Sequence, residues 1–202
     1  MVVGLPQKNK KIYSTYKERK IDKSINFLVY AGSQGSLDIL NIFIKIIKEL
    51  KKISNFKKIK FIVQCPVQKQ NEIKNLLTQN KYEFEVNSFF NDFDNILSKT
   101  NIALCRSGAG TINDLINFKI PAIISPLPSA KDNHQYENAK ILSNIKCAIL
   151  TDKNTIDFDR IILFIRKVID DKNFNKSLID KYSKIKRPNT NKLMWSIIKD
   201  DQ

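Results

Sequence analysis

The sequence predicts an α/β protein with a Rossmann-like, doubly wound parallel sheet that is covered by helices on both faces. Six short apolar runs alternate with segments of helical period, and several of these runs are nearly continuous in Val, Ile and Leu. Strands that are apolar on both faces are typical of parallel sheets buried between helices. With 202 residues, the chain is long enough for one domain with a large core.

The expected elements follow the chain in βα order. The strands are expected at 25–32, 58–65, 82–89, 101–105, 120–126 and 147–150. Helices are expected between them at 36–52, 67–79, 93–99, 109–118 and 132–144, and closing helices from about 155 at 155–170, 173–185 and 190–199. The first 20 residues are polar, basic and aperiodic, so we expect a connector at 1–20 and one domain over 21–202. Ligands of such sheets bind beyond the carboxyl ends of the strands, which directs attention to the loops there.

The formal net charge of +15 would suit nucleic acid or an anionic membrane surface. The lysines, however, are spread along the whole chain among many Ile and Asn residues, a pattern typical of A/T-rich coding sequence. No dense basic block interleaved with aromatic residues occurs, so we expect no nucleic-acid partner. Contact with a membrane surface stays open.

Three cysteines, Cys65, Cys105 and Cys147, lie far apart and each is in or beside an apolar run. We expect buried free thiols in a reducing compartment rather than disulfides or a zinc site. The N-terminus lacks the apolar core of a signal peptide, and no run approaches the roughly 18 apolar residues of a membrane span. These features predict a cytoplasmic protein that is soluble or peripherally attached to a membrane.

The first strand runs into the turn "GSQGS" at 32–36, directly before a helical segment. Its glycines allow a tight turn and let backbone N–H groups approach an anion, while Ser33 can donate a hydrogen bond and Ser36 can cap the helix. A plain strand-to-helix turn would have the same pattern. The turn is neither a G-x-G-x-x-G fingerprint nor a phosphate loop that ends in Gly-Lys-Ser/Thr.

The fourth strand ends in "CRSGAGT" at 105–111, again before a helix. Free N–H groups and the positive end of the helix dipole would face the same edge of the sheet. Asp114 can accept hydrogen bonds from ligand hydroxyls, or it can simply favour the helix N-terminus. Arg106 and Lys131 supply basic neighbours.

The loop after the fifth strand leads through "KDNHQYENA" at 131–139 into a helix. His134 is the only histidine, which excludes a metal site made of several histidines, and we interpret it as a polar ligand contact or helix-start residue rather than a catalytic base. Asp92 and Asp94 have a metal-binding spacing but precede a short helix, so we interpret them as capping residues. Three such helix starts at one edge predict a site for a phosphorylated, hydroxyl-rich ligand, either a nucleotide sugar or a dinucleotide.

In this order and spacing, "AGSQGS", "CRSGAGTINDL" and "KDNHQYENA" resemble the C-terminal half of the MurG-type glycosyltransferases of family 28. The resemblance implies a GT-B fold, in which two Rossmann-like domains face a cleft and the C-terminal one holds UDP-GlcNAc. It also implies transfer of GlcNAc to undecaprenyl-diphosphate-MurNAc-pentapeptide, the step from lipid I to lipid II in peptidoglycan synthesis.

The resemblance assigns donor-binding roles by position. Phe90 would hold the uracil through its backbone, Asp114 stands where the family has a ribose-binding Glu, and Gln135 matches a glutamine that holds the GlcNAc hydroxyls. Asp114 is one methylene shorter than Glu, and Lys8 replaces an arginine without its planar fork. The implied donor-binding residues are Lys8, Ser33, Gln34, Gly35, Phe90, Arg106, Ser107, Ala109, Gly110, Thr111, Asp114, His134 and Gln135.

The family's acceptor-binding N-terminal domain has no counterpart in this sequence. We therefore expect a chain that binds UDP-GlcNAc, needs an N-terminal acceptor domain or subunit for its general base, and is inactive as an isolated half. The expected chemistry is an inverting hexosyl transfer to a lipid-linked acceptor at the cytoplasmic face of the inner membrane, with no cofactor and no tightly bound metal. The alternatives are a family 28 half that acts on another lipid acceptor and a non-catalytic remnant or regulatory module.

Overall fold

The computed structural model describes residues 24–30, 36–52, 59–127, 133–151 and 155–185. Within these residues, six strands form a single parallel sheet in the order β3-β2-β1-β4-β5-β6. The predicted Rossmann-like, doubly wound sheet is therefore confirmed. The strands are β1 (Ile25–Tyr30), β2 (Ile59–Gln64), β3 (Glu83–Asn87), β4 (Ile102–Cys105), β5 (Ala122–Ile124) and β6 (Ala148–Leu150).

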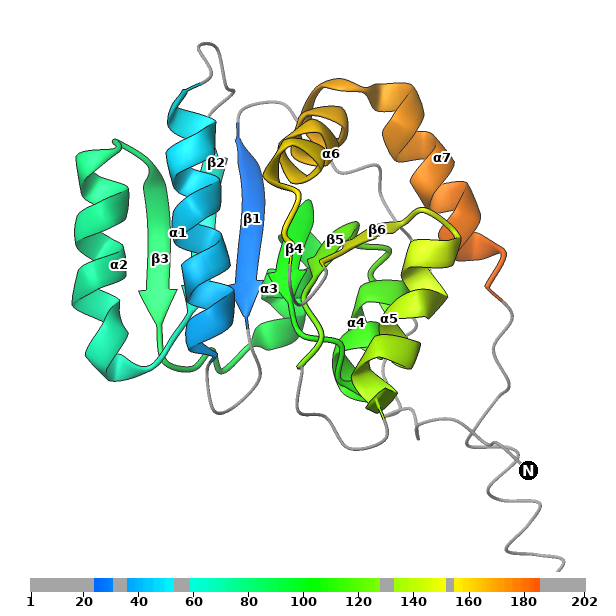
Figure 1. Cartoon of the computed structure of the whole chain (residues 1–202), viewed down its shortest axis with the longest axis horizontal. Coiled ribbons are helices and arrows are strands. Elements are labelled where there is room, and N and C mark those ends of the chain that lie inside the picture. The colour runs from blue at the N-terminus through cyan, green and yellow to red at the C-terminus, as the bar shows by residue number, and fades with distance from the viewer. Residues whose placement is uncertain (1–23, 31–35, 53–58, 128–132, 152–154, 186–202) are drawn as a thin grey trace, which may run out of the picture.

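The helices connect the strands and cover the sheet (Figure 1). They are α1 (Leu37–Lys51), α2 (Val67–Gln79), α3 (Phe93–Lys99), α4 (Ala109–Asn117), α5 (His134–Asn144), α6 (Phe158–Asp170) and α7 (Lys172–Ser183). In the view of Figure 1, α1 and α2 lie in front of the sheet and α3 lies behind it. The strand order reverses between β1 and β4, and it is at this point of a doubly wound sheet that a crevice is expected at the carboxyl edge.

Aromatic contacts show which side chains of β1 face which layer. Phe43 of α1 packs on Phe61 of β2, with ring centroids 5.2 Å apart, and Phe61 also contacts Phe27 of β1. Because successive side chains alternate across a strand, Tyr30 points to the opposite face from Phe27. There its ring meets Phe93 of α3 edge-on at 5.2 Å. Tyr30 therefore reaches the crevice from the α3 face.

The last two described helices complete the core rather than extend the sheet. α6 packs against α1 and α7. The Tyr182 hydroxyl of α7 donates a hydrogen bond to the carbonyl oxygen of Ile120, just before β5. Cys147 packs under α7, and it is buried and free like Cys65 and Cys105, as predicted. No helix in the described part of the chain is both long and apolar enough to span a bilayer.

Most predicted element boundaries differ from the structure by only a few residues. On the site side, β3 and β5 each end two residues earlier than predicted, and α5 begins two residues later, at His134 rather than 132, because Asn133 takes a left-handed backbone conformation with φ 55° at the N-cap. The connector expected at 1–20 and the helix expected at 190–199 lie outside the described residues.

Candidate functional site

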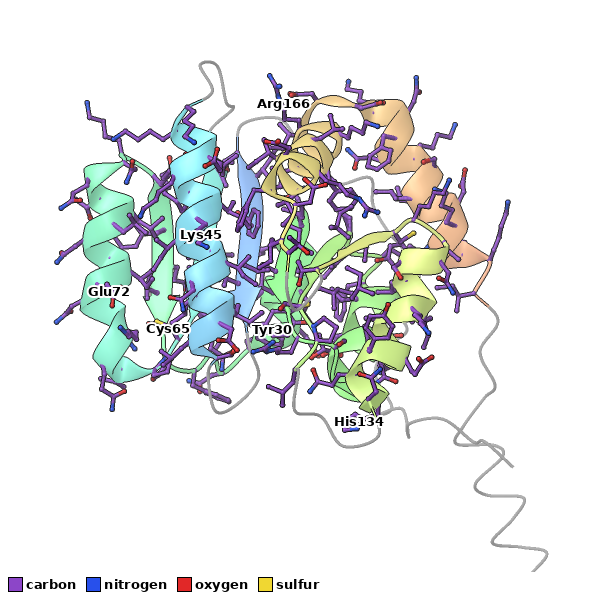
Figure 2. All side chains as sticks on the ribbon, in the orientation of Figure 1. Tyr30, Lys45, Cys65, Glu72, His134 and Arg166 are labelled. Carbon is purple, nitrogen blue, oxygen red and sulfur yellow. The ribbon has the colours of Figure 1, made fainter. Side chains whose placement is uncertain are left out.

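The candidate site lies at the carboxyl edge of the sheet, around the crevice between β1 and β4. β1 ends at Tyr30, and the turn at 31–35 that follows it lies outside the described residues. β4 ends at Cys105, and a three-residue loop then leads into α4. Figure 2 shows Tyr30 and His134 at this same edge, on β1 and at the start of α5.

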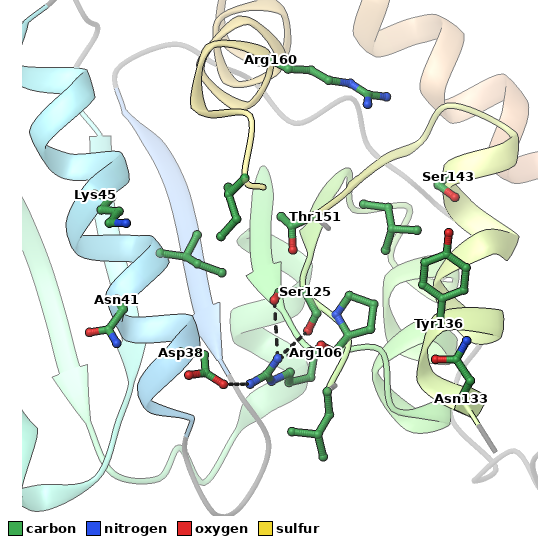
Figure 3. Close-up of a pocket in the computed structure, with 15 residues that line it drawn as sticks. Asp38, Asn41, Lys45, Arg106, Ser125, Asn133, Tyr136, Ser143, Thr151 and Arg160 are labelled. Carbon is green, nitrogen blue, oxygen red and sulfur yellow. Dashed lines mark hydrogen bonds and ion pairs between the residues drawn. The ribbon is translucent and has the colours of Figure 1, made fainter. Parts of the chain in front are cut away.

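Arg106 is the central structural residue of this edge. Its side chain is 8% exposed, and its Nη1 donates to the carbonyl oxygens of Ser125 at 3.1 Å and Pro126 at 2.9 Å. Its Nη2 donates to Ser36 Oγ at 2.6 Å and to Asp38 Oδ2 at 2.7 Å (Figure 3). The guanidinium thus ties the β4 loop to the start of α1 and to the loop after β5.

These bonds change the role expected for Ser36. It occupies the N-cap position of α1, as predicted, but its side chain makes no capping hydrogen bond and instead accepts from Arg106. Arg106 was predicted as a basic ligand contact. In this structure its terminal nitrogens bind protein atoms, so the side chain holds the loops together and its positive charge lies at the carboxyl edge of the sheet.

The start of α4 is open. Gly108 is the N-cap with φ −58° and ψ 151°, which any residue adopts, and a Cβ added to it would meet only Thr111 Oγ1 at 3.9 Å. A Cβ added to Gly110 would find no further neighbour within 4 Å among the residues that the structure describes. The first main-chain bond of the helix runs from Ile112 N to the Gly108 oxygen, so the preceding N–H groups have no partner within the helix.

α5 is fixed to both neighbouring loops by two amide side chains. Gln135 Oε1 accepts from the Leu127 N–H at 3.0 Å, and Asn138 Nδ2 donates to the Ser107 oxygen at 3.1 Å. Because the main-chain N–H fixes which end of the Gln135 amide accepts, its Nε2 is left to donate. His134, one residue earlier, is exposed.

A groove of about 870 Å³ runs along the α1 face of the sheet, between α1, α5 and α6. Figure 3 shows Asn41 and Lys45 on its α1 wall, Tyr136 and Asn133 on its α5 wall, and Arg160 on α6. We call this the front groove. Its lining residues are Asp38, Asn41, Ile42, Lys45, Arg106, Ser125, Pro126, Leu127, Asn133, Tyr136, Ser143, Leu150, Thr151, Ile156 and Arg160.

Other predicted residues gather on the α3 side of the crevice. Asp114 of α4 influences the pKa of the Tyr30 hydroxyl through its charge, and Thr111 lies within hydrogen-bonding reach of that hydroxyl. Phe90 is 6% exposed and lines a second hollow of about 480 Å³ beside α3. Arg106 lines the front groove, and Ser107, Ala109 and Gly110 follow it in the chain as the loop after β4 leads into α4. The site thus has a front side, at the front groove, and an α3 side, at the hollow lined by Phe90, with the loop after β4 between α1 and α4.

Three buried polar atoms around the crevice have no hydrogen-bond partner among the described residues: Tyr30 Oη, Arg106 Nε and Ser107 Oγ. Ser107 is fully buried and Tyr30 is 4% exposed. Buried polar groups are nearly always paired in folded proteins, so an unpaired cluster marks a place with a further requirement. Burial also raises the pKa of Cys105 to about 12 and, with the nearby Cys105 and Asp114, raises that of Tyr30 well above 10.0.

The structure brings together Arg106, Ser107, Ala109, Gly110, Thr111, Asp114, His134 and Gln135 at one edge, with Phe90 beside α3. The predicted contacts Lys8, Ser33, Gln34 and Gly35 lie outside the described residues, as does Lys131. Sequence reasoning missed Tyr30 and Asp38. It placed Asn138 among the polar residues at the start of this helix, inside the motif "KDNHQYENA", but gave it no role of its own. Nothing local distinguishes Tyr30 from the other strand residues.

Asp92 is a capping residue, as interpreted from the sequence. Its side chain accepts from the Asn95 N–H at 3.2 Å at the start of α3. In the described ranges, no group of three or more His, Cys, Asp or Glu side chains is placed to hold a metal ion.

Comparison with known proteins identifies the domain type. Residues 26–193 match the model of the glycosyltransferase family 28 C-terminal domain. A curated relative from Rickettsia bellii, a UDP-N-acetylglucosamine–N-acetylmuramyl-(pentapeptide) pyrophosphoryl-undecaprenol N-acetylglucosamine transferase, is 30% identical over 98% of this chain and 56% of its own length. A relative of the same name from Wolbachia is 34% identical over 66% of this chain and 39% of its own length. The chain thus spans about half, or less, of the curated relatives it matches.

Solved structures agree on the fold. The crystal structure of Acinetobacter baumannii MurG covers 88% of this chain with a TM-score of 0.74 and 22% identity, over 50% of that protein. The glycosyltransferase VinC in complex with dTDP covers 90% of this chain with a TM-score of 0.60 and 14% identity, over 43% of its own length. The structural neighbours are GT-B glycosyltransferases, and this chain corresponds to half of each.

Proposed function

The chain belongs to glycosyltransferase family 28, and from this premise we propose that it is the donor-binding half of a UDP-GlcNAc-dependent N-acetylglucosaminyltransferase. The proposed reaction is the one for which its curated relatives are named, transfer of GlcNAc to an undecaprenyl-diphosphate-linked muramyl-pentapeptide. Those relatives are about twice as long as this chain.

The observation that carries the proposal is the open start of α4. Neither the backbone conformation of Gly108 nor packing against atoms of the described residues requires glycine there. A serine at the N-cap would stabilise the helix more than glycine does, and the described residues do not explain why glycine is present. A ligand that lies against the main chain would explain it, because a side chain would obstruct that ligand. The free N–H groups and the helix dipole attract a diphosphate to this place.

Gln135 supports the sugar end of this arrangement. With Oε1 bound to the Leu127 N–H, its Nε2 is a fixed donor on the first turn of α5. A sugar hydroxyl or the N-acetyl carbonyl of GlcNAc can accept from it, and exposed His134 beside it offers a further polar contact. We place GlcNAc near α5 and the uridine on the α3 side, near Phe90 and Asp114.

In the proposed mechanism, an acceptor hydroxyl attacks the anomeric carbon of GlcNAc with inversion, and UDP leaves. The leaving diphosphate gains negative charge as the glycosidic bond breaks. The N–H groups at the start of α4 and the buried charge of Arg106 then stabilise the transition state more than the ground state. The general base comes from an acceptor-binding domain or subunit at the carboxyl edge, at a membrane surface where the lipid-linked acceptor resides.

Titration calorimetry with UDP-GlcNAc, UDP-glucose and NAD tests the ligand class. We expect UDP-GlcNAc to bind more tightly than UDP-glucose, and NAD not to bind. Binding of NAD without either UDP-sugar would end the glycosyltransferase proposal.

The variant Gly108→Ser tests the binding mode. Serine should leave the free energy of unfolding unchanged or raise it by a few tenths of a kcal/mol, while UDP-GlcNAc affinity falls about tenfold because the side chain occupies the ligand's place. Ser98→Ala, on the exposed side of α3, is the matched control with unchanged affinity. Wild-type affinity in Gly108→Ser would remove the diphosphate from the start of α4.

A further inference from the structure

The front groove carries positive charge that the described part of the chain does not neutralise. Lys45 of α1 and Arg160 of α6 line it, and neither forms an ion pair with a described residue (Figure 3). The Nζ atom of Lys45 lies 5.6 Å from the centre of the Phe158 ring, so this charge is at the α6 end of the groove. Asp38, the one acidic residue among the described lining, is already paired with Arg106 at 2.7 Å. Two cations are therefore available to an anionic ligand.

The rest of the lining suits a peptide better than a phosphate group. A volume of about 870 Å³ is in the range of pockets that hold drug-sized ligands. The side-chain amides of Asn41 and Asn133 can pair with peptide N–H and C=O groups, and Ile42 offers an apolar contact. The start of α6 is not open to a phosphate, because the Asp157 side chain caps it by accepting from the Arg160 N–H at 2.9 Å.

The groove begins beside the place proposed for GlcNAc. Gln135, the proposed sugar contact, accepts through Oε1 from the N–H of Leu127, and Leu127 lines the groove. Asn133 and Tyr136, two residues before and one residue after Gln135, line it as well. The sugar that receives GlcNAc must come within bonding distance of it, so this sugar enters beside α5. A chain attached to the acceptor sugar can then extend along the groove toward α6.

We propose that the front groove binds the peptide of the acceptor, with the C-terminal carboxylate of the peptide held by Lys45 and Arg160. This inference rests on the proposed function, in which the acceptor sugar carries a pentapeptide. The muramyl group acylates the N-terminus of this peptide, so the free carboxylate is at the end away from the sugar. The groove has the same order, with the sugar at α5 and the two cations toward α6.

NMR titration of the ¹⁵N-labelled chain tests the ligand, with UDP at saturation so that the proposed donor site is filled. The probes are N-acetylmuramyl-pentapeptide, the same compound with a C-terminal amide, and inorganic pyrophosphate. We expect the free acid to shift the main-chain signals of Asn41 and Tyr136. The amide should bind at least about threefold more weakly, because it lacks the charge that the cations attract. Pyrophosphate should bind more weakly than the free acid.

Two double variants remove the same charge from the same two helices. Lys45→Gln/Arg160→Gln should weaken binding of the free acid about tenfold and leave the affinities for the amide and for UDP changed less than about twofold. Lys48→Gln/Arg166→Gln is the matched control, because Lys48 and Arg166 are exposed on α1 and α6 but do not line the groove. The control should change all three affinities less than about twofold. All four side chains are exposed, so both variants should fold like the unaltered chain.

Several results would overturn the inference while UDP binding shows that the donor site stands. They are no binding of the free acid, equal binding of free acid and amide, or an equal loss of affinity in the two double variants. Stronger binding of pyrophosphate than of the free acid, lost in Lys45→Gln/Arg160→Gln, would assign the groove to a phosphate group instead. If the unaltered chain does not bind UDP, the proposed function fails and this inference fails with it.

Discussion

Replacing Arg106 with methionine should lower the free energy of unfolding by about 3 kcal/mol without unfolding the domain. Two of its hydrogen bonds go to main-chain oxygens, those of buried Ser125 and half-buried Pro126. Hydrogen bonds from a charged donor are worth about 1.5–3 kcal/mol each, and the desolvation of the guanidinium offsets part of the sum. Methionine retains most of the apolar contacts of the arginine stem.

The partner at the other end of the guanidinium should matter much less. Asp38 is 66% exposed, so its carboxylate is already largely hydrated, and an exposed ion pair is worth at most about 1 kcal/mol. Asp38→Asn is therefore the matched comparison, with a loss of about 0.5 kcal/mol. The asymmetry follows from burial: in Arg106→Met the two carbonyl oxygens lose a charged donor, while in Asp38→Asn the group that is lost was already largely hydrated.

Urea denaturation followed by circular dichroism measures both variants. A domain of this size has a total stability of about 5–15 kcal/mol, so both variants should still fold and give complete transitions. A loss below about 1 kcal/mol in Arg106→Met, or an equal loss in Asp38→Asn, would show that Arg106 does not tie the loops together through the main chain.

Three further predictions concern bonds and burial elsewhere. Asn138→Ala removes the hydrogen bond to the Ser107 oxygen, so the free energy of unfolding should fall by about 1 kcal/mol. Calorimetry should also show weaker UDP-GlcNAc binding, and unchanged binding would contradict a role for Asn138 in holding the loop after β4. Tyr182→Phe removes the bond to Ile120 and should cost about 1 kcal/mol in urea denaturation with unchanged UDP-GlcNAc affinity, since α7 lies away from the carboxyl edge. Burial raises the pKa of the Cys147 thiol from 9.0 to about 11, so the folded chain binds this proton more tightly than the unfolded chain does. The resulting contribution to the free energy of unfolding is complete below pH 9 and should be lost as the pH rises through about 11. A pH series of unfolding free energies should show a shallower decline in Cys147→Ala, and an identical decline would refute the assignment.

The fold could be predicted because its signals are local and repeated. Six apolar runs and the helical period between them appear directly in the sequence, and parallel sheets buried on both faces produce such runs. The boundary of α5 was less accessible. It depends on a left-handed backbone conformation at the N-cap residue, Asn133. The sequence alone offers Asp132 and Asn133 equally as N-cap residues.

The site could be predicted only in part, because its geometry depends on contacts between distant segments. The glycine-rich loop after β4 shows its character in seven consecutive residues. Arg106, however, reaches its main-chain partners 19 and 20 residues further along, and Ser36 70 residues earlier. Tyr30 is hidden for a different reason: in a strand with buried side chains on both faces, the sequence does not tell which face a residue joins. The contact with Phe93 supplies that information.

The two sides of the site are mechanically joined at the loop after β4, and this explains why so much structure converges there. Arg106 links that loop to α1 and to the β5 loop on the front side, while Asn138 holds the Ser107 oxygen from α5. A ligand that spans both sides therefore meets surfaces whose relative positions are already fixed, so less conformational entropy is lost on binding. In the proposed mechanism, the same rigidity keeps the N–H groups of α4 directed at one place as charge develops there, which is the condition for electrostatic stabilisation of a leaving diphosphate. On this proposal the buried arginine contributes to binding through the loops that it holds in place, and its charge adds to the field that the helix start provides.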